Sequence, residues 1–245
     1  MSLILEVIGY KGVVGNATYQ WLNSMKSDEV ELLGRDIDDP LLTAAKLKGN
    51  HIMSYVCVPE KAVTAVVGEL NYADLIIIRS TVPPGTCSKL MEETGKHICH
   101  MPEFLVAATA VVDEFNQDYL ILGACCEEHT KALEGMYSPY MPLIVTDTYT
   151  SEILKLAKNS YLACLISFWN EIEQIARAAG TTGHRVGKLA TLDNRVSRYG
   201  ANYHHKYGGA CLPKDIEQLA IYANGQGINT PLLNAIAEVN ECQES

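Results

Sequence analysis

A strand, a glycine-rich turn and a helix follow one another at the start of the chain, and this order constrains the fold more than any other feature. Residues 3–8 are mostly apolar and read as a strand, residues 9–15 read G-Y-K-G-V-V-G, and residues 16–25 are predicted to be helical. Glycines in such a turn let the backbone approach a pyrophosphate, which the helix N-terminus stabilises. The spacing is one residue longer than the common fingerprint, so the flanking strand and helix carry the prediction of a dinucleotide-binding fold.

The next predicted strand, residues 29–34, is followed by Arg35 and Asp36. Asp36 lies about where a dinucleotide-binding fold has the acid that accepts a hydrogen bond from the ribose 2′-hydroxyl. A carboxylate there repels a 2′-phosphate, so the sequence predicts NAD as the cofactor in preference to NADP. Arg35 and Asp38, on either side of it, weaken this preference slightly.

Short apolar segments recur through the N-terminal half and alternate with segments of helical or turn character. Strands are predicted over residues 52–58, 75–79, 97–100, 119–123 and 143–146. Such alternation indicates a doubly wound parallel sheet, whose ligands bind beyond the carboxyl ends of the strands. Thr81 and Glu103 both occupy that kind of position. On pattern alone, Thr81 is as well explained as a capping residue and Glu103 as a solvated loop residue.

The pattern becomes all-helical from Ser151 onward. Ser151 and Glu152 are predicted to cap a long helix that runs to about residue 179 and has a broad apolar face. We therefore predict an α/β protein, in which a Rossmann-type doubly wound parallel sheet over residues 1–149 precedes an all-helical domain over residues 150–245.

Two polar residues share one side of this long helix. Lys155 and Asn159 are four residues apart and therefore lie one above the other. Spacing alone more often indicates a solvated lysine beside a polar neighbour. Lysine can also stabilise an alkoxide or take part in proton transfer, so a catalytic role stays open.

Near its end the chain has a thiol between two glycines and two charged residues, in the segment Y-G-G-A-C-L-P-K-D at residues 207–215. Glycines allow close approach of a ligand to the backbone. A cation next to Cys211 favours the thiolate, which attacks carbonyl carbon. Asp215 could orient or protonate the species that forms. Without its neighbours, Cys211 would be better explained as a small buried residue in a turn.

Composition excludes several classes of protein. The net charge of −10 argues against a general nucleic-acid surface, and no apolar run reaches the roughly 18 residues that a membrane helix needs. The first residues resemble a strand more than a signal peptide. Eight cysteines without a disulfide framework indicate reduced thiols and a cytoplasmic location. No cysteine and histidine spacing typical of zinc is present, so no metal site is predicted.

Four segments together resemble the UDP-glucose/GDP-mannose dehydrogenases. Residues 207–215 resemble the catalytic cysteine motif G-G-S-C-F-P-K-D, residues 80–83 match S-T-V-P, and residues 102–105 match P-E-F-L. Residues 152–159 resemble the helix E-x-x-K-x-x-x-N, whose lysine and asparagine are shared with 6-phosphogluconate and 3-hydroxyisobutyrate dehydrogenases. The resemblance spans nearly the whole chain.

The resemblance implies a four-electron oxidation of a nucleotide-sugar, such as UDP-glucose, to the uronic acid. Two NAD are used in turn, and a thioester forms on Cys211. The implied catalytic residues are Cys211, Lys155, Asp215, Glu103, Thr81 and Asn159. The implied cofactor-binding residues are Gly9, Gly12, Val13, Val14, Gly15, Asp36, Val58, Pro59, Thr81 and Lys214. The implied substrate-binding residues are Phe104, Leu105, Tyr207, Gly208 and Gly209. A homodimer through the long helix is also implied.

The chain departs from the family pattern in several places. Ala210 and Leu212 replace the serine and phenylalanine of the cysteine motif, and Ala107 replaces a second glutamate. The stretch between residues 36 and 52 is short, and the family's C-terminal domain, which binds the UDP-sugar, is expected to be missing. Two alternatives therefore stay open: a two-electron β-hydroxyacid dehydrogenase, and a non-catalytic remnant that binds NAD or a partner.

Overall fold

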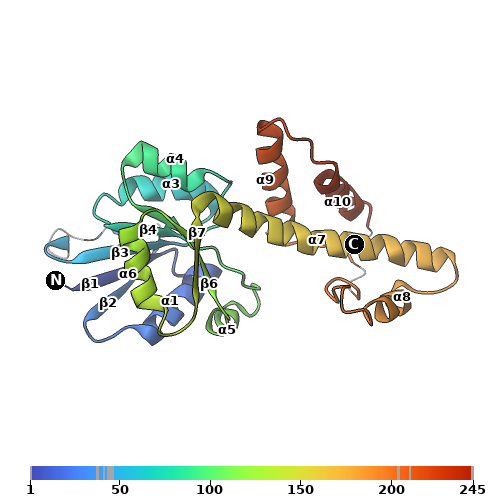
Figure 1. The fold of residues 1–245 in the computed structure, drawn as a ribbon, viewed down its shortest axis with the longest axis horizontal. Coiled ribbons are helices and arrows are strands. Elements are labelled where there is room, and N and C mark those ends of the chain that lie inside the picture. The colour runs from blue at the N-terminus through green and yellow to red at the C-terminus, as the bar shows by residue number, and fades with distance from the viewer. Residues whose placement is uncertain are drawn as a thin grey trace. The chain divides into compact units, whose positions relative to one another are not determined.

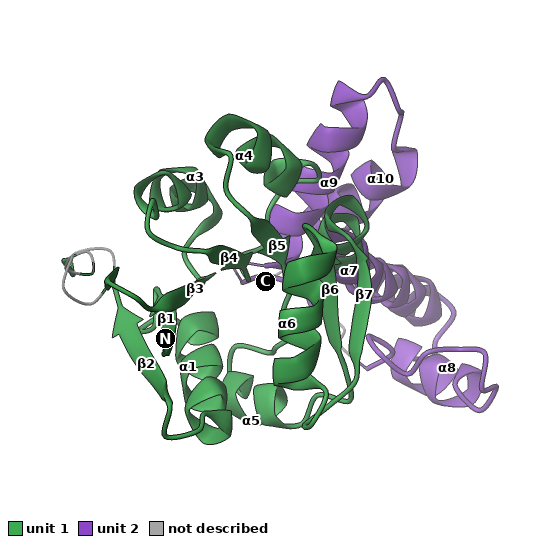
Figure 2. Cartoon of the chain, turned by 60° about the vertical axis from the view of Figure 1, so that its left-hand side comes forward, with its two compact units in different colours: residues 1–155 green, residues 156–245 purple. Residues whose placement is uncertain are grey.

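The chain divides into two compact units, residues 1–155 and residues 156–245 (Figure 2). The computed structural model describes residues 2–36, 39–40, 42, 47–202, 205–209 and 211–243. Asp38 and Ala210, which entered the predictions above, lie outside the described residues, as does part of the short stretch after Asp36. Within the described residues, no helix combines the length and the apolar character that crossing a membrane requires.

Unit 1 is built on a seven-stranded sheet with the strand order β2-β1-β3-β4-β5-β6-β7 (Figure 1). The strands are β1 (Leu3–Ile8), β2 (Val30–Arg35), β3 (His51–Val56), β4 (Leu75–Ile78), β5 (Ile98–His100), β6 (Leu120–Ala124) and β7 (Leu143–Asp147). Each predicted strand is present, with ends within two residues of the prediction. Apolar runs between turn-forming residues are therefore sufficient to locate them.

Helices cover both faces of this sheet (Figure 2). Side chains alternate along a strand, so Leu75 and Ile77 pack with α1 and α6 on one face, whereas Ile76 and Ile78 pack with α3 and α4 on the other. The helices are α1 (Val13–Met25), α3 (Glu60–Glu69), α4 (Thr86–Thr94), α5 (Ala110–Phe115), which packs against α1, and α6 (Glu127–Tyr137). The predicted doubly wound α/β fold is confirmed.

One junction in the sheet is antiparallel, a detail that the prediction of a doubly wound parallel sheet did not include. β5 pairs with β6 at His100 and Gly123 in antiparallel orientation, and every other pair of neighbouring strands is parallel. The segment between β5 and β6 includes α5, on the same face as α1, and the chain returns to the sheet in the opposite direction. The carboxyl end of β6 therefore lies at the same edge of the sheet as the start of β5.

The long helix α7 (Thr148–Ala178) begins three residues earlier than predicted. Asp147 accepts hydrogen bonds from the main-chain N–H and the hydroxyl of Thr150, so it provides the cap that was assigned to Ser151 and Glu152. Glu152 is buried and instead accepts hydrogen bonds from the N–H groups of Gly85 and Cys87, at the start of α4. The predicted domain boundary at residues 149 and 150 falls within α7 and stays a prediction.

Unit 2 is helical. Beside most of α7, it contains α8 (Gly183–Ala190), α9 (Leu212–Gly225) and α10 (Pro231–Glu241), with α9 and α10 in contact. Its core is formed by Ala163, Ile166, Tyr207, Ile216 and Ile236. Pro213 lies in the first turn of α9, where a proline is tolerated because its missing N–H would have no partner within the helix.

Candidate active site

The glycine-rich turn between β1 and α1 is packed so closely that side chains do not fit. Gly9 has a φ of 82°, and a Cβ there would lie 2.5 Å from the carbonyl oxygen of Cys57. A Cβ on Gly15 would overlap the carbonyl of Gly9. Gly12 is the N-cap residue of α1, which has neither a side-chain cap nor an acidic residue in its first turn. The free amide groups of a helix N-terminus suit a pyrophosphate, so the turn fits a dinucleotide.

Arg35, which weakened the preference for NAD in the sequence, is turned into the interior of unit 1. Its guanidinium lies 2.9 Å from the carboxylate of Glu6, and both side chains are buried. Glu6 also accepts hydrogen bonds from the hydroxyls of Ser54 and Tyr72. Arg35 is therefore committed to a buried network and is not available to a 2′-phosphate. Asp36 follows it, immediately after β2.

The segments that follow β3 and β4 are tied to each other. The Ser80 hydroxyl donates to the carbonyl oxygens of Val58, at 2.6 Å, and Val56. Val58 is buried, and Pro59 is the N-cap residue of α3. Thr81, next to Ser80, is half-buried. These residues thus form one layer at the carboxyl edge of the sheet, the same edge as the glycine-rich turn.

Lys155 and Glu103 form a buried ion pair in unit 1. The Lys155 ammonium lies 2.8 Å from the Glu103 carboxylate and donates to the Glu103 carbonyl oxygen at 2.6 Å. Leu105 N–H donates to the second carboxylate oxygen at 2.8 Å, and the Phe104 ring lies 5.6 Å from the Lys155 nitrogen. The P-E-F-L segment and the start of α7 therefore hold each other in place. The sequence suggested both residues separately but not this contact.

Sequence reasoning missed several buried polar residues at the same edge. His100 is fully buried at the end of β5 and bonds to the Ser151 hydroxyl at 2.8 Å. Burial lowers its pKa to about 3, so the imidazole is neutral at pH 7. Arg79 and Glu114 form a second ion pair at 2.8 Å, with both side chains inaccessible to solvent. In a sequence, a single charged residue beside an apolar run does not indicate that its side chain is buried or which residue it pairs with.

Cys211, Lys214 and Asp215 lie together at the start of α9 in unit 2. Cys211 is exposed and is the N-cap residue of the helix, where the first-turn amide groups stabilise an anion. Asp215 is buried; its carboxylate accepts a hydrogen bond from the Asn159 amide at 2.5 Å and lies 2.6 Å from the Lys214 ammonium. Asn159 lies on α7. The structure thus joins two of the sequence motifs through Asn159 and Asp215.

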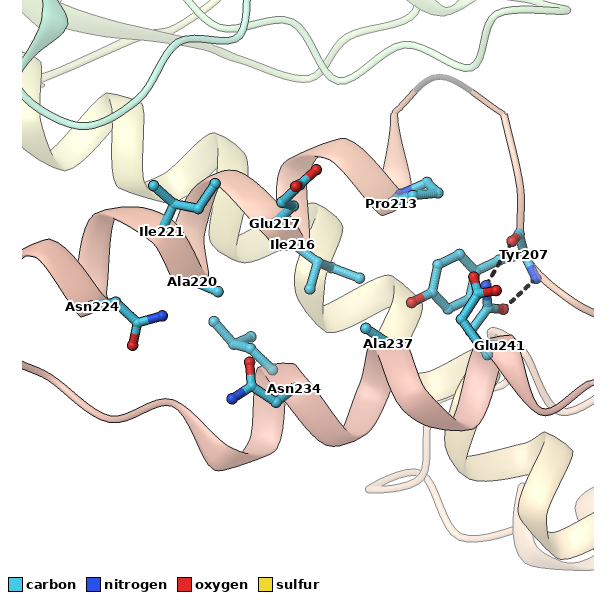
Figure 3. Close-up of a pocket in the computed structure, with 12 residues that line it drawn as sticks. Tyr207, Pro213, Ile216, Glu217, Ala220, Ile221, Asn224, Asn234, Ala237 and Glu241 are labelled. Atoms are coloured by element: carbon cyan, nitrogen blue, oxygen red, sulfur yellow. Dashed lines mark hydrogen bonds between the residues drawn. The ribbon is translucent and has the colours of Figure 1, made fainter.

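Tyr207 anchors the segment that leads to Cys211. It is 2% exposed, its N–H donates to the Asn240 side chain, and its carbonyl accepts from the same amide. Tyr207 lies at one end of a mostly apolar cavity of about 340 Å³ between α9 and α10 (Figure 3). Among the described residues, Cys211 and Asp215 are not part of its lining. The substrate contact predicted for Tyr207, Gly208 and Gly209 stays a prediction.

Comparison with known proteins decides the family. Residues 41–141 match the model of the UDP-glucose/GDP-mannose dehydrogenase family, NAD binding domain, and residues 149–242 match that of the family's central domain. The chain belongs to this family. The predicted resemblance and the NAD-binding domain are thereby confirmed. A UDP-glucose 6-dehydrogenase of Rickettsia conorii is 32% identical over 210 residues, which are 83% of this chain and 48% of that protein.

Solved structures show the same fold. A UDP-glucose dehydrogenase from Pyrobaculum islandicum has a TM-score of 0.77 at 24% identity, over 98% of this chain and 68% of that one. A 3-hydroxyisobutyrate dehydrogenase from Mycobacterium tuberculosis has a TM-score of 0.71 at 16% identity, over 98% of this chain and 93% of that one. At these identities the likeness establishes the fold alone. The chain spans about half the length of the relatives that it matches in sequence.

Proposed function

We propose that this chain carries the NAD-binding and catalytic parts of a nucleotide-sugar 6-dehydrogenase, which oxidises a primary alcohol to a carboxylic acid. The observation that carries the proposal is the hydrogen bond between Asn159 and Asp215. It links the lysine helix to the cysteine segment 56 residues away and leaves the exposed thiol of Cys211 at the start of α9. An exposed thiol in this position suits covalent catalysis on a carbonyl.

Each catalytic residue has a role in the proposed reaction. NAD, when bound, accepts a hydride from the sugar carbon. Lys155, Asn159 and Asp215 take the proton of the alcohol and stabilise the resulting alkoxide, which becomes an aldehyde when its carbon gives up the hydride. The Cys211 sulfur adds to the aldehyde carbon and forms a thiohemiacetal, and Cys211 stays bound to this carbon as it becomes a thioester; a second NAD would supply the acceptor for the second hydride. Water, positioned by Glu103 and Thr81, then cleaves the thioester to the acid and the free thiol.

The cofactor-binding residues support NAD. Gly9, Gly12 and Gly15 allow the tight turn that precedes α1, and Val13 and Val14 form the start of that helix, whose first-turn amide groups are proposed to bind the pyrophosphate. Asp36 is proposed to bind the ribose 2′-hydroxyl. Lys214 is proposed to contact the cofactor, although its ammonium is held by Asp215 in this structure.

The test is to count NADH per sugar consumed, with UDP-glucose, GDP-mannose and related nucleotide-sugars as substrates. We expect two NADH per sugar. Cys211→Ser should stop acid formation and trap an ester or an aldehyde-level product, whereas Cys242→Ser, at an exposed cysteine on the end of α10, should behave as the wild type. One NADH per sugar would favour the two-electron β-hydroxyacid dehydrogenase. A folded chain that binds NAD without turnover would overturn the proposal.

We also propose that two copies associate through α7. Tyr161, Phe168 and Ile175 are spaced by seven residues, so they lie along one side of the helix, and they are 57%, 50% and 64% exposed. Exposed apolar stripes of this kind mark association surfaces. Sedimentation equilibrium should show a dimer, and Phe168→Glu should convert it to a monomer; an unchanged dimer would contradict the proposal. The cytoplasmic location stays a prediction.

A further inference from the structure

We propose that unit 1 binds one Zn²⁺ ion through His97, Cys125, Cys126 and His129, at the edge of the sheet opposite the glycine-rich turn. The four side chains form the only group of this kind among the residues that the structure describes, and their ligand atoms all lie within 4.8 Å of one another. The site is independent of the proposed reaction, because His97 precedes β5 whereas Glu103 follows it.

Four distances between the ligand atoms are close to those of a tetrahedral site. The Cys125 and Cys126 sulfurs are 3.8 Å apart. Cys126 sulfur lies 3.1 Å from Nδ1 of His129 and 3.9 Å from Nδ1 of His97, and Cys125 sulfur lies 3.9 Å from Nδ1 of His129. Tetrahedral bonds of about 2.3 Å to sulfur and about 2.0 Å to nitrogen put neighbouring ligand atoms about 3.3 to 3.8 Å apart. Small side-chain movements would therefore complete the coordination.

The antiparallel junction of the sheet creates this cluster. His100 pairs with Gly123, and continuing that register by three residues brings His97 opposite Cys126. Had β6 been parallel to β5, Cys125 and Cys126 would lie at the other edge of the sheet. His129 joins them from the first turn of α6, whose N-cap residue is Cys126. The sequence predicted no metal site because it lacks a zinc spacing, and the fold brings the ligands together instead.

The donor set selects the metal. Two thiolates and two imidazoles in a tetrahedral arrangement suit Zn²⁺ better than Mg²⁺ or Ca²⁺, which prefer oxygen. His97 is exposed and the other three residues are half-buried, so an ion can enter from solvent. Bound there, it would link the start of β5 to the end of β6 and to α6. The ion would therefore be structural and would fasten β5 to β6 and α6 across the antiparallel junction of the sheet.

The test uses the full chain without a histidine tag, in reducing buffer. After incubation with Zn²⁺ and gel filtration, mass spectrometry of the metal content should give about one Zn²⁺ per chain. With Co²⁺ in place of Zn²⁺, the d–d bands of a tetrahedral ion and a thiolate charge-transfer band should appear. Zn²⁺ should raise the Tm by about 5 °C or more, and a chelator should reverse this.

Matched variants identify the ligands. Cys126→Ser and His129→Asn should each lower Zn²⁺ affinity at least about 10-fold, since loss of even an outer-shell partner has an effect of that size. His51→Asn, at an exposed histidine of the same sheet edge, and Cys242→Ser should not change it. If the variants fail to fold, alkylation of the wild type replaces them: Zn²⁺ should protect Cys125 and Cys126 from iodoacetamide but not Cys242.

Several results would overturn the proposal. Uptake well below one ion per chain, or uptake that the Cys126 and His129 variants leave unchanged, would exclude these ligands. The Cys99 sulfur lies 3.5 Å from that of Cys125. A disulfide between Cys99 and Cys125 in protein freshly isolated from reducing cytosol would show that these thiols undergo oxidation and do not bind a metal. NAD binding measured in parallel is expected to be unaffected by Cys126→Ser, which separates this result from the proposed reaction.

Discussion

Two of the buried ion pairs in unit 1, Arg79–Glu114 and Lys155–Glu103, have the same length of 2.8 Å. Their side chains differ in exposure: 0% for both partners of the first pair, and 5% and 10% for the second. The second pair also involves main-chain groups of the P-E-F-L segment. Both pairs are buried and charged, but the slight exposure of Lys155–Glu103, its main-chain contacts and its position within the family motifs distinguish the candidate catalytic pair from the structural one.

Burial opposes the charges of the first pair. It raises the pKa of Glu114, and the Arg79 guanidinium only partly offsets this. Burial is the largest single influence on the pKa of Arg79 and acts to lower it, but the Glu114 carboxylate together with other neighbouring groups raises that pKa above its ordinary value. A raised carboxyl pKa means that the ionised form is less favourable in the folded state than in the unfolded chain. The surrounding fold therefore keeps the two charged groups together, and the pair itself adds little to the free energy of unfolding.

The largest expected effect follows from breaking the Arg79–Glu114 pair. Arg79→Met leaves the Glu114 carboxylate buried without its partner and should lower the free energy of unfolding by about 3 to 5 kcal/mol. Urea titration can follow unit 1 alone through the fluorescence of buried Trp21, in a Trp169→Phe background. The double variant Arg79→Met/Glu114→Leu should recover most of the loss. If Arg79→Met alone lowers the free energy of unfolding by less than about 1 kcal/mol, the Arg79–Glu114 pair behaves like an exposed ion pair, which would contradict the comparison.

Lys155→Met should separate function from stability. Loss of the ammonium should lower kcat by about 10²- to 10³-fold, as expected for a residue that stabilises an alkoxide or transfers its proton. Its effect on urea unfolding should be smaller than that of Arg79→Met, because Glu103 keeps the hydrogen bond from Leu105 N–H and some contact with solvent. NADH formation and urea titration on the same preparations measure both. Equal destabilisation by the two variants would mean that the pairs do not differ.

The sequence predicts the layers of this fold well, for a local reason. Runs such as residues 75–78 are apolar at every position and end at turn-forming residues, which sets strand type and ends without knowledge of the neighbours. The direction of a strand is not local. Nothing in residues 120–124 shows that β6 runs antiparallel to β5, so the mixed sheet and the cysteine and histidine cluster could not be predicted.

The candidate site shows the same limit. Glu152 has the local pattern of a helix cap, yet it binds the N–H groups of Gly85 and Cys87, some 65 residues earlier in the chain. Asn159 and Asp215 belong to two separate motifs. The family resemblance assigns both motifs to one site, but no periodicity in the sequence predicts the hydrogen bond between the two residues. His100 and Glu114 were missed because the free energy of a buried charge or imidazole depends on partners distant in the sequence.

His100 extends the comparison of buried groups to the pH dependence of stability. Its pKa is near 6.5 in the unfolded chain and about 3 in the folded one, because burial disfavours the charged ring. Between these values the unfolded chain binds the extra proton, so stability is complete above pH 6.5 and falls on acidification. From pH 7.5 to 4.5 this residue should remove about 2 to 3 kcal/mol of unfolding free energy. His100→Gln should flatten the profile over this range; an equally steep profile would exclude His100 as its cause.

The smallest expected effect concerns Asp36 and depends on the third buried pair, Arg35–Glu6. With Arg35 held by Glu6, Asp36 is the charge that a 2′-phosphate would meet. Asp36→Ser should weaken NADH binding and strengthen NADPH binding, so that the ratio of their Kd values changes about 10-fold, or about 1.4 kcal/mol. Fluorescence titration of both cofactors measures this. Asp28→Ser, at an exposed carboxylate before β2, is the control and should leave the ratio unchanged. If Asp36→Ser also leaves it unchanged, cofactor choice does not depend on this carboxylate.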